Sequence, residues 1–147
     1  MPWARDRVTG RDNPSGWTRT LELERLSAES AQILAPYVDR ACVEELFDAG
    51  TEGKRWAAIV LMEHNSKIAS PRVLAAAVEK PVSRFELYHA LKVIEDMTLI
   101  DPPSPDLAHL LSIVKQEQEA GRLRSPHSDG YSDVDMLAQR ILARSGQ

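Results

Sequence analysis

The side chains that could carry metal chemistry are few and scattered along the chain. There are four histidines and a single cysteine, Cys42. The histidines are His64, His89, His109 and His127. Zinc sites use paired cysteines or histidines at short intervals, and these residues have no such spacing among themselves or with Cys42. We therefore expect neither a metal nor a cofactor.

Catalytic signatures are equally sparse. Ser125, His127 and Asp129 lie together in a polar loop, whereas a Ser–His–Asp triad is assembled by the fold and is not read from loop neighbours. Cys42 has no histidine near it in the sequence, which favours a small buried side chain over a nucleophile. The seven glycines form neither G-x-G-x-x-G nor a Walker pattern. We predict that the chain is not an enzyme.

The most informative residues lie on a helix expected from residue 83 to about 97. Arg84, Tyr88 and Lys92 are four residues apart and share one helical face. Arginine can contact guanine edges, and lysine and tyrosine can hold phosphates. We expect the residues of this helix that face outward, and bind DNA or a partner, to be Ser83, Arg84, Phe85, Glu86, Tyr88, His89 and Lys92.

Two helices joined by a short turn must position these side chains. Residues 72 to 79 form an alanine-rich helix that Ser70 and Pro71 begin, and a turn at residues 80 to 82 precedes the next helix, which Ser83 caps. Such helices cross steeply, so that the second one projects, and in DNA-binding proteins it enters the major groove. The side chains expected to seal the core are Val78, Val82, Leu87, Leu91 and Ile94.

This pattern resembles the helix-turn-helix of winged-helix proteins over residues 54 to 100. Leu74-Ala75 stands where the second helix opens, Val82-Ser83 where the turn ends, and residues 94 to 100 where the chain leads into the wing. The match is degenerate: Thr98 replaces the usual glycine, and residues 101 to 103, Asp-Pro-Pro, stand in place of a basic wing. The resemblance implies DNA binding or, in members that have lost the wing, protein binding.

Further helices are predicted on both sides of this centre. Residues 28 to 49 have helical spacing, with Pro36 predicting a kink or two short helices and Gly50 a stop. Residues 106 to 120 and 133 to 144 predict two C-terminal helices. We predict a mainly α fold, with a winged-helix-like three-helix core flanked by N-terminal and C-terminal helices.

Other segments leave alternatives open. Residues 1 to 26 are predicted to be a tail, in which residues 17 to 26 could form a short strand or a helix. Residues 98 to 100 are apolar and compatible with a strand. A weak internal similarity, which we call the echo, relates Arg55-Trp56 to Arg84-Phe85 and Ser70-Pro71 to Ser104-Pro105, at offsets of 29 and 34 residues. Two imperfect copies of this kind could form a small helical-repeat array.

Composition narrows the class of protein. The length of 147 residues is that of one domain, which we place at residues 27 to 147. Hydrophobic residues make up 43% of the chain and charged residues 27%, as in ordinary globular proteins. A single cysteine indicates a reducing compartment, and no apolar run approaches the roughly 20 residues that span a bilayer. We expect a cytoplasmic protein without membrane contact, and a homodimer through the flanking helices.

Charge is uneven along the chain. Residues 53 to 94 hold seven basic and three acidic side chains, a net charge of +4 in a chain of net charge −4. A basic segment in an acidic chain is compatible with an anionic partner or with an ordinary solvated surface. The first hypothesis is a DNA-binding transcriptional regulator. The alternative is a protein–protein interaction adaptor, anchored by Phe85 and Tyr88.

Overall fold

A computed structural model describes residues 33–100, 102–124 and 133–146, and this part of the chain is mainly helical, as predicted. Six α-helices lie wholly within it, and none of its residues forms a strand. The α-helices are α2 (Arg40–Asp48), α3 (Glu52–His64), α4 (Pro71–Glu79), α5 (Arg84–Thr98), α6 (Leu107–Glu119) and α7 (Asp133–Arg144). Two short 3₁₀ helices, η1 (Ala35–Tyr37) and η2 (Ser66–Ile68), precede α2 and α4.

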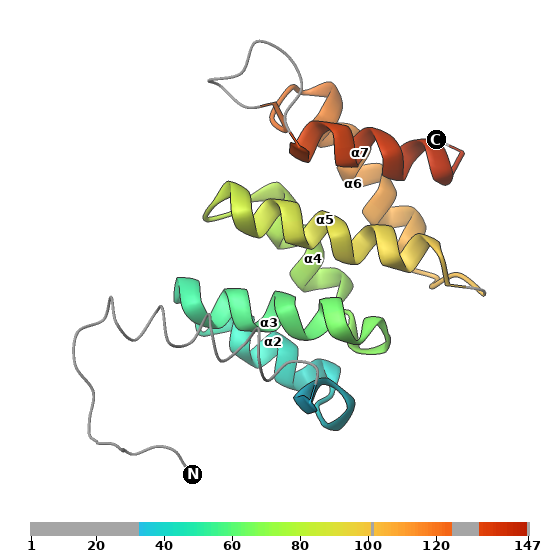
Figure 1. The fold of residues 1–147 in the computed structure, drawn as a ribbon. Helices are drawn as coiled ribbons and strands as arrows, with labels where there is room; N and C mark the ends of the chain where they lie inside the picture. Colours follow the sequence, from blue (N-terminus) through green and yellow to red (C-terminus); the bar gives the residue numbers. More distant parts are fainter. Residues whose placement is uncertain (1–32, 101, 125–132, 147) are drawn as a thin grey trace.

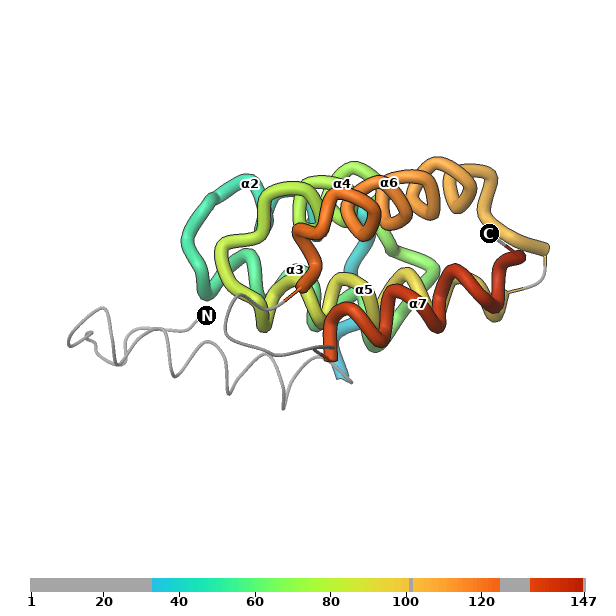
Figure 2. Tube along the Cα trace, turned by 90° about the horizontal axis from the view of Figure 1, so that it is seen from above, coloured from blue at the N-terminus to red at the C-terminus, as the bar shows by residue number. Residues whose placement is uncertain are grey.

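The six helices form three successive pairs that stack on one another. Figure 1 shows α2 with α3, α4 with α5, and α6 with α7, in that order along the stack. Seen along the other direction, α2, α4 and α6 form one layer and α3, α5 and α7 the other (Figure 2). Stacked helix pairs in two layers are the arrangement of helical-repeat proteins, in which each pair contacts its neighbours.

Side-chain caps explain where several helices begin. The side chains of Asp39, Thr51, Ser70 and Ser83 accept hydrogen bonds from backbone N–H groups in the first turns of α2, α3, α4 and α5. Each such cap stabilises its helix by about 1 kcal/mol. Gly50 and Gly121 follow α2 and α6 with φ of 84° and 78°, a left-handed conformation that glycine adopts without strain.

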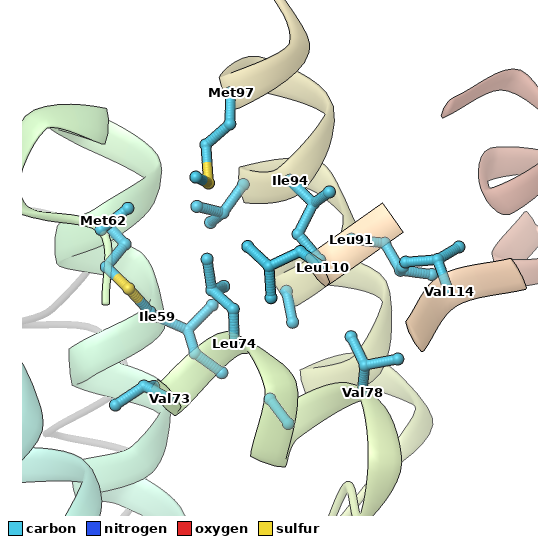
Figure 3. Close-up of a cluster of buried hydrophobic side chains, with 14 of the residues drawn as sticks. Ile59, Met62, Val73, Leu74, Val78, Leu91, Ile94, Met97, Leu110 and Val114 are labelled. Atoms are coloured by element: carbon cyan, nitrogen blue, oxygen red, sulfur yellow. The ribbon is translucent and has the colours of Figure 1, made fainter. Parts of the chain in front are cut away.

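The core is built from aliphatic side chains of both layers. Figure 3 shows Ile59 and Met62 of α3 meeting Leu74 of α4, Ile94 of α5 and Leu110 of α6 in a continuous apolar cluster. All five side chains are fully buried. The same cluster extends to buried residues of α2 and α7, so the three pairs share one hydrophobic core.

The two helices predicted at residues 72 to 79 and 83 to 97 are present as α4 and α5, joined by the expected turn. Leu87, Leu91 and Ile94 are buried as predicted. Val82, by contrast, is 52% exposed, so its predicted place in the core is wrong.

The segment around Pro36 and residues 98 to 100 had been given alternative predictions. Pro36 lies in η1, and Val38 and Asp39, in extended backbone, separate η1 from α2, so the predicted interruption of the helix near Pro36 is present. Residues 28 to 32 of the predicted segment lie outside the described residues. The interpretation of residues 98 to 100 as a possible strand is wrong, since Thr98 ends α5 and Leu99 caps it. The tail at residues 1 to 26 lies outside the described residues, and the winged-helix resemblance stays a prediction.

Helix α5 is the centre of its layer. It lies between α3 and α7 (Figures 1 and 2). Glu95, on the α7 side, is 4% exposed and forms ion pairs with Arg140 and Arg144 of α7 and with Lys92 of its own helix. Two flanks of α5 are therefore covered by neighbouring helices. None of the described helices has the length and apolar character needed to cross a bilayer.

Candidate functional site

Glu86 was expected to face outward, and the structure overturns that expectation. It is 3% exposed, and its carboxylate accepts from Nε and Nη2 of Arg55 on α3, at 3.0 and 2.5 Å. Because α3 packs beside α5, the first turn of α5 lies against Arg55, and Glu86 is buried in that contact. Glu86 therefore joins two helix pairs.

Arg84 and Lys92, the two cations of the helical face predicted to contact DNA, also form contacts within the protein. The Arg84 guanidinium donates to the backbone carbonyl oxygens of Leu123 and Arg124, at 2.7 and 3.3 Å. The Lys92 ammonium lies 3.4 Å from Glu95. Ser83 caps α5 through its hydroxyl, which accepts from the Glu86 N–H at 3.0 Å. Arg84 thus links the start of α5 to the segment that follows α6, whereas Lys92 pairs with a carboxylate of its own helix.

Four ring-bearing side chains instead gather between α3 and α5, and we call them the aromatic cluster: Trp56, Phe85, Tyr88 and His89. The centroid of the Trp56 ring lies 4.6 Å from that of Phe85 and 4.7 Å from that of His89, with both rings edge-on. Phe85 and His89 are 4.5 Å apart, and Tyr88 lies 5.3 Å from His89. Edge-to-face pairs of this kind stabilise by about 1 kcal/mol each.

A hydrogen bond holds the imidazole of His89 in the cluster. Its Nδ1 lies 2.7 Å from Oε1 of Glu63 on α3, and both side chains are about three-quarters buried. The ring is thereby fixed in orientation between Trp56 and Phe85. His89 has a structural partner on α3 that the sequence spacing did not indicate.

A pocket of about 230 Å³ opens beside the cluster. It is lined by Glu52, Trp56, Ser83, Phe85 and Glu86, which come from the first two turns of α3, the start of α5 and the residue that caps α5. Phe85 is 52% exposed at its edge, and so is Val82 in the preceding turn. The lining thus contains two aromatic and two acidic residues, of which Glu86 is buried against Arg55.

No family model, curated protein or solved structure matches this chain.

The other candidate residues of the sequence are not brought together. Within the described residues no three His, Cys, Asp or Glu side chains are grouped so that they could hold a metal ion. Burial, followed by the charges of Asp39 and Glu45, raises the pKa of the Cys42 thiol above its ordinary value, which disfavours a thiolate nucleophile. Ser125, His127 and Asp129 lie outside the described residues.

Sequence reasoning missed three residues of the site: Glu52, Arg55 and Trp56. The echo between Arg55-Trp56 and Arg84-Phe85 was the signal that could have found two of them, because equivalent positions of stacked helix pairs lie side by side. Trp56 and Phe85 do touch across the two pairs.

Proposed function

We propose that this chain is a non-enzymatic protein-binding module, the second of the two hypotheses. The surface that we assign to binding is the aromatic cluster with the pocket beside it. The observation that carries the proposal is Phe85, which stands half-exposed against Trp56 and His89 at the edge of the pocket. Its partner would be a peptide segment of another protein.

An exposed aromatic ring next to a pocket is well suited to protein recognition. Aromatic side chains supply a large contact area with few rotatable bonds, and they are enriched among the residues that dominate binding energy. The Phe85 ring is held by its neighbours, so little conformational freedom remains to be lost when a partner binds. Val82 adds apolar surface in the turn just before α5.

The same contacts argue against the DNA-binding hypothesis. To contact DNA phosphates, Arg84 would have to give up its hydrogen bonds to backbone carbonyl oxygens, and Lys92 would have to leave the buried carboxylate of Glu95. Tyr88, the third residue of the helical face predicted to contact DNA, is half-buried and packs against the core. Helical arrays, in contrast, commonly bind extended segments of other proteins along their surface.

A random-peptide phage library, selected on the full 147-residue chain, tests the proposal. We expect selected peptides to bind the wild-type protein and to lose about tenfold or more in affinity for Phe85→Ala. The matched control is Leu99→Ala, which removes an exposed side chain from the C-cap position at the other end of α5. Peptides that bind wild type and Phe85→Ala equally well, or an enriched pool that never contacts this surface, would overturn the proposal.

A further inference from the structure

The geometry points to a basic side chain, arginine or lysine, as the group that the pocket takes from the partner. This inference rests on the proposed function and deepens it, since it names the chemistry of the residue recognised at that surface. It depends on the walls of the pocket and on the charge that remains uncompensated there.

The walls favour a cation on an apolar stem. Trp56 and Phe85 line the pocket with rings 4.6 Å apart, set edge to face. Aromatic faces attract guanidinium and ammonium groups, and tryptophan does so most strongly. The methylene stems of arginine and lysine also pack on apolar surface while their heads stay near polar groups. A long basic side chain therefore meets both requirements of the walls.

The uncompensated charge at the pocket is negative. Glu86 is neutralised by Arg55, whose own side chain is only 14% exposed. Glu52 is exposed, and within the described residues its carboxylate has neither an ion pair nor a side-chain hydrogen bond. A partner's guanidinium or ammonium group would supply the missing counter-charge.

Other side chains fit less well. An acidic side chain would meet the carboxylate of Glu52, which lies in the first turn of α3 and already offsets the positive end of that helix. An apolar side chain would contact the two rings but gain nothing from Glu52. The choice between these classes can be measured directly.

The test uses NMR titration of the full chain with three short peptides of the form Gly-Gly-X-Gly-Gly, where X is arginine, norleucine or glutamate. The reporter is the indole N–H signal of Trp56, assigned by its loss in Trp56→Phe. We expect the arginine peptide to shift this signal with a dissociation constant of about 1 mM, as suits one side chain. The norleucine and glutamate peptides should bind at least about threefold more weakly.

The variant Glu52→Gln should lower the affinity for the arginine peptide about threefold and leave the affinity for the norleucine peptide unchanged. Glu119→Gln, an exposed acid on α6, is the matched control. Equal shifts by arginine and norleucine, or no effect of Glu52→Gln, would overturn the basic-residue inference while the phage result for Phe85→Ala still stands. Absence of any shift with all three peptides would also overturn it, and the library would then decide the proposed function separately.

Discussion

Arg55 and Glu86, 31 residues apart in the sequence, form a two-point ion pair that joins α3 to α5. The Arg55 guanidinium also lies 4.0 Å above the ring of Phe47 on α2. One side chain thus connects three helices from two adjacent pairs. Since Glu86 is almost fully buried, the pair is a determinant of how these two pairs stack.

Removing either partner alone should destabilise the protein strongly. Arg55→Met would leave the Glu86 carboxylate buried without its counter-charge, and Glu86→Met would leave the guanidinium unpaired. We expect each to lower the free energy of unfolding by about 3 kcal/mol, measured by urea denaturation.

The double variant distinguishes pairing from packing. Because the second substitution removes the unpaired charge left by the first, the double variant should lose about 2 kcal/mol less than the two single losses added together. Strict additivity would show that the two side chains do not interact in solution.

Core packing is tested at Leu91, which is fully buried on α5. Leu91→Ala should cost about 2–5 kcal/mol, because it removes buried methyl groups and leaves a cavity. Leu99→Ala, at the C-cap of the same helix and 66% exposed, should change stability by less than about 0.5 kcal/mol. Thermal unfolding of the two variants side by side checks this, and similar losses would contradict the burial of α5 between its neighbours.

Glu95 gives the stability of the α5–α7 contact a pH dependence. Hydrogen bonds from Arg140, followed by Lys92, hold the pKa of Glu95 below its ordinary value of 4.5, although burial acts in the opposite direction. A carboxylate with a lowered folded-state pKa contributes stability above its unfolded pKa and loses it as the pH falls through the folded value. Glu95→Gln should therefore cost about 2 kcal/mol at neutral pH and flatten the stability loss below about pH 4.5.

The neighbouring Asp96 supplies the control of opposite sign. Burial raises the pKa of Asp96, so its ionisation opposes folding at neutral pH and the penalty is relieved on acidification. Asp96→Asn should thus leave neutral-pH stability unchanged or raise it. Denaturation midpoints from pH 3 to 7 measure both effects, and a Glu95→Gln profile parallel to that of the wild type would refute the role given to Glu95.

DNA binding is the remaining prediction of the sequence that a direct measurement can settle. If Arg84 and Lys92 held phosphates, Arg84→Ala with Lys92→Ala would lower the salt slope of binding by roughly two units. We expect instead no binding to random duplex at micromolar protein in low salt, because both cations bond to groups of the protein itself. Fluorescence anisotropy measures this, and a steep salt dependence that the double substitution weakens would restore the regulator hypothesis.

Local signals in the sequence predicted most of the helices correctly. Ser70 with Pro71, Ser83 and the glycines at 50 and 121 mark helix ends through chemistry confined to a few neighbouring residues. The apolar spacing of Leu87, Leu91 and Ile94 likewise identified the buried side of α5, because helical periodicity alone places them on one face. These properties require no knowledge of what the helix packs against.

Which helices pack against α5 could not be predicted from such local signals. A solvated face and a face covered by another helix can carry the same polar residues when ion pairs form across the contact, as Glu86 with Arg55 and Glu95 with Arg140 do. Only the stacking of α5 between α3 and α7 shows which polar residues are buried, and it also brings Trp56 against Phe85. Contacts between residues some 30 to 45 positions apart depend on which helices become neighbours, and local spacing along the chain does not carry that information.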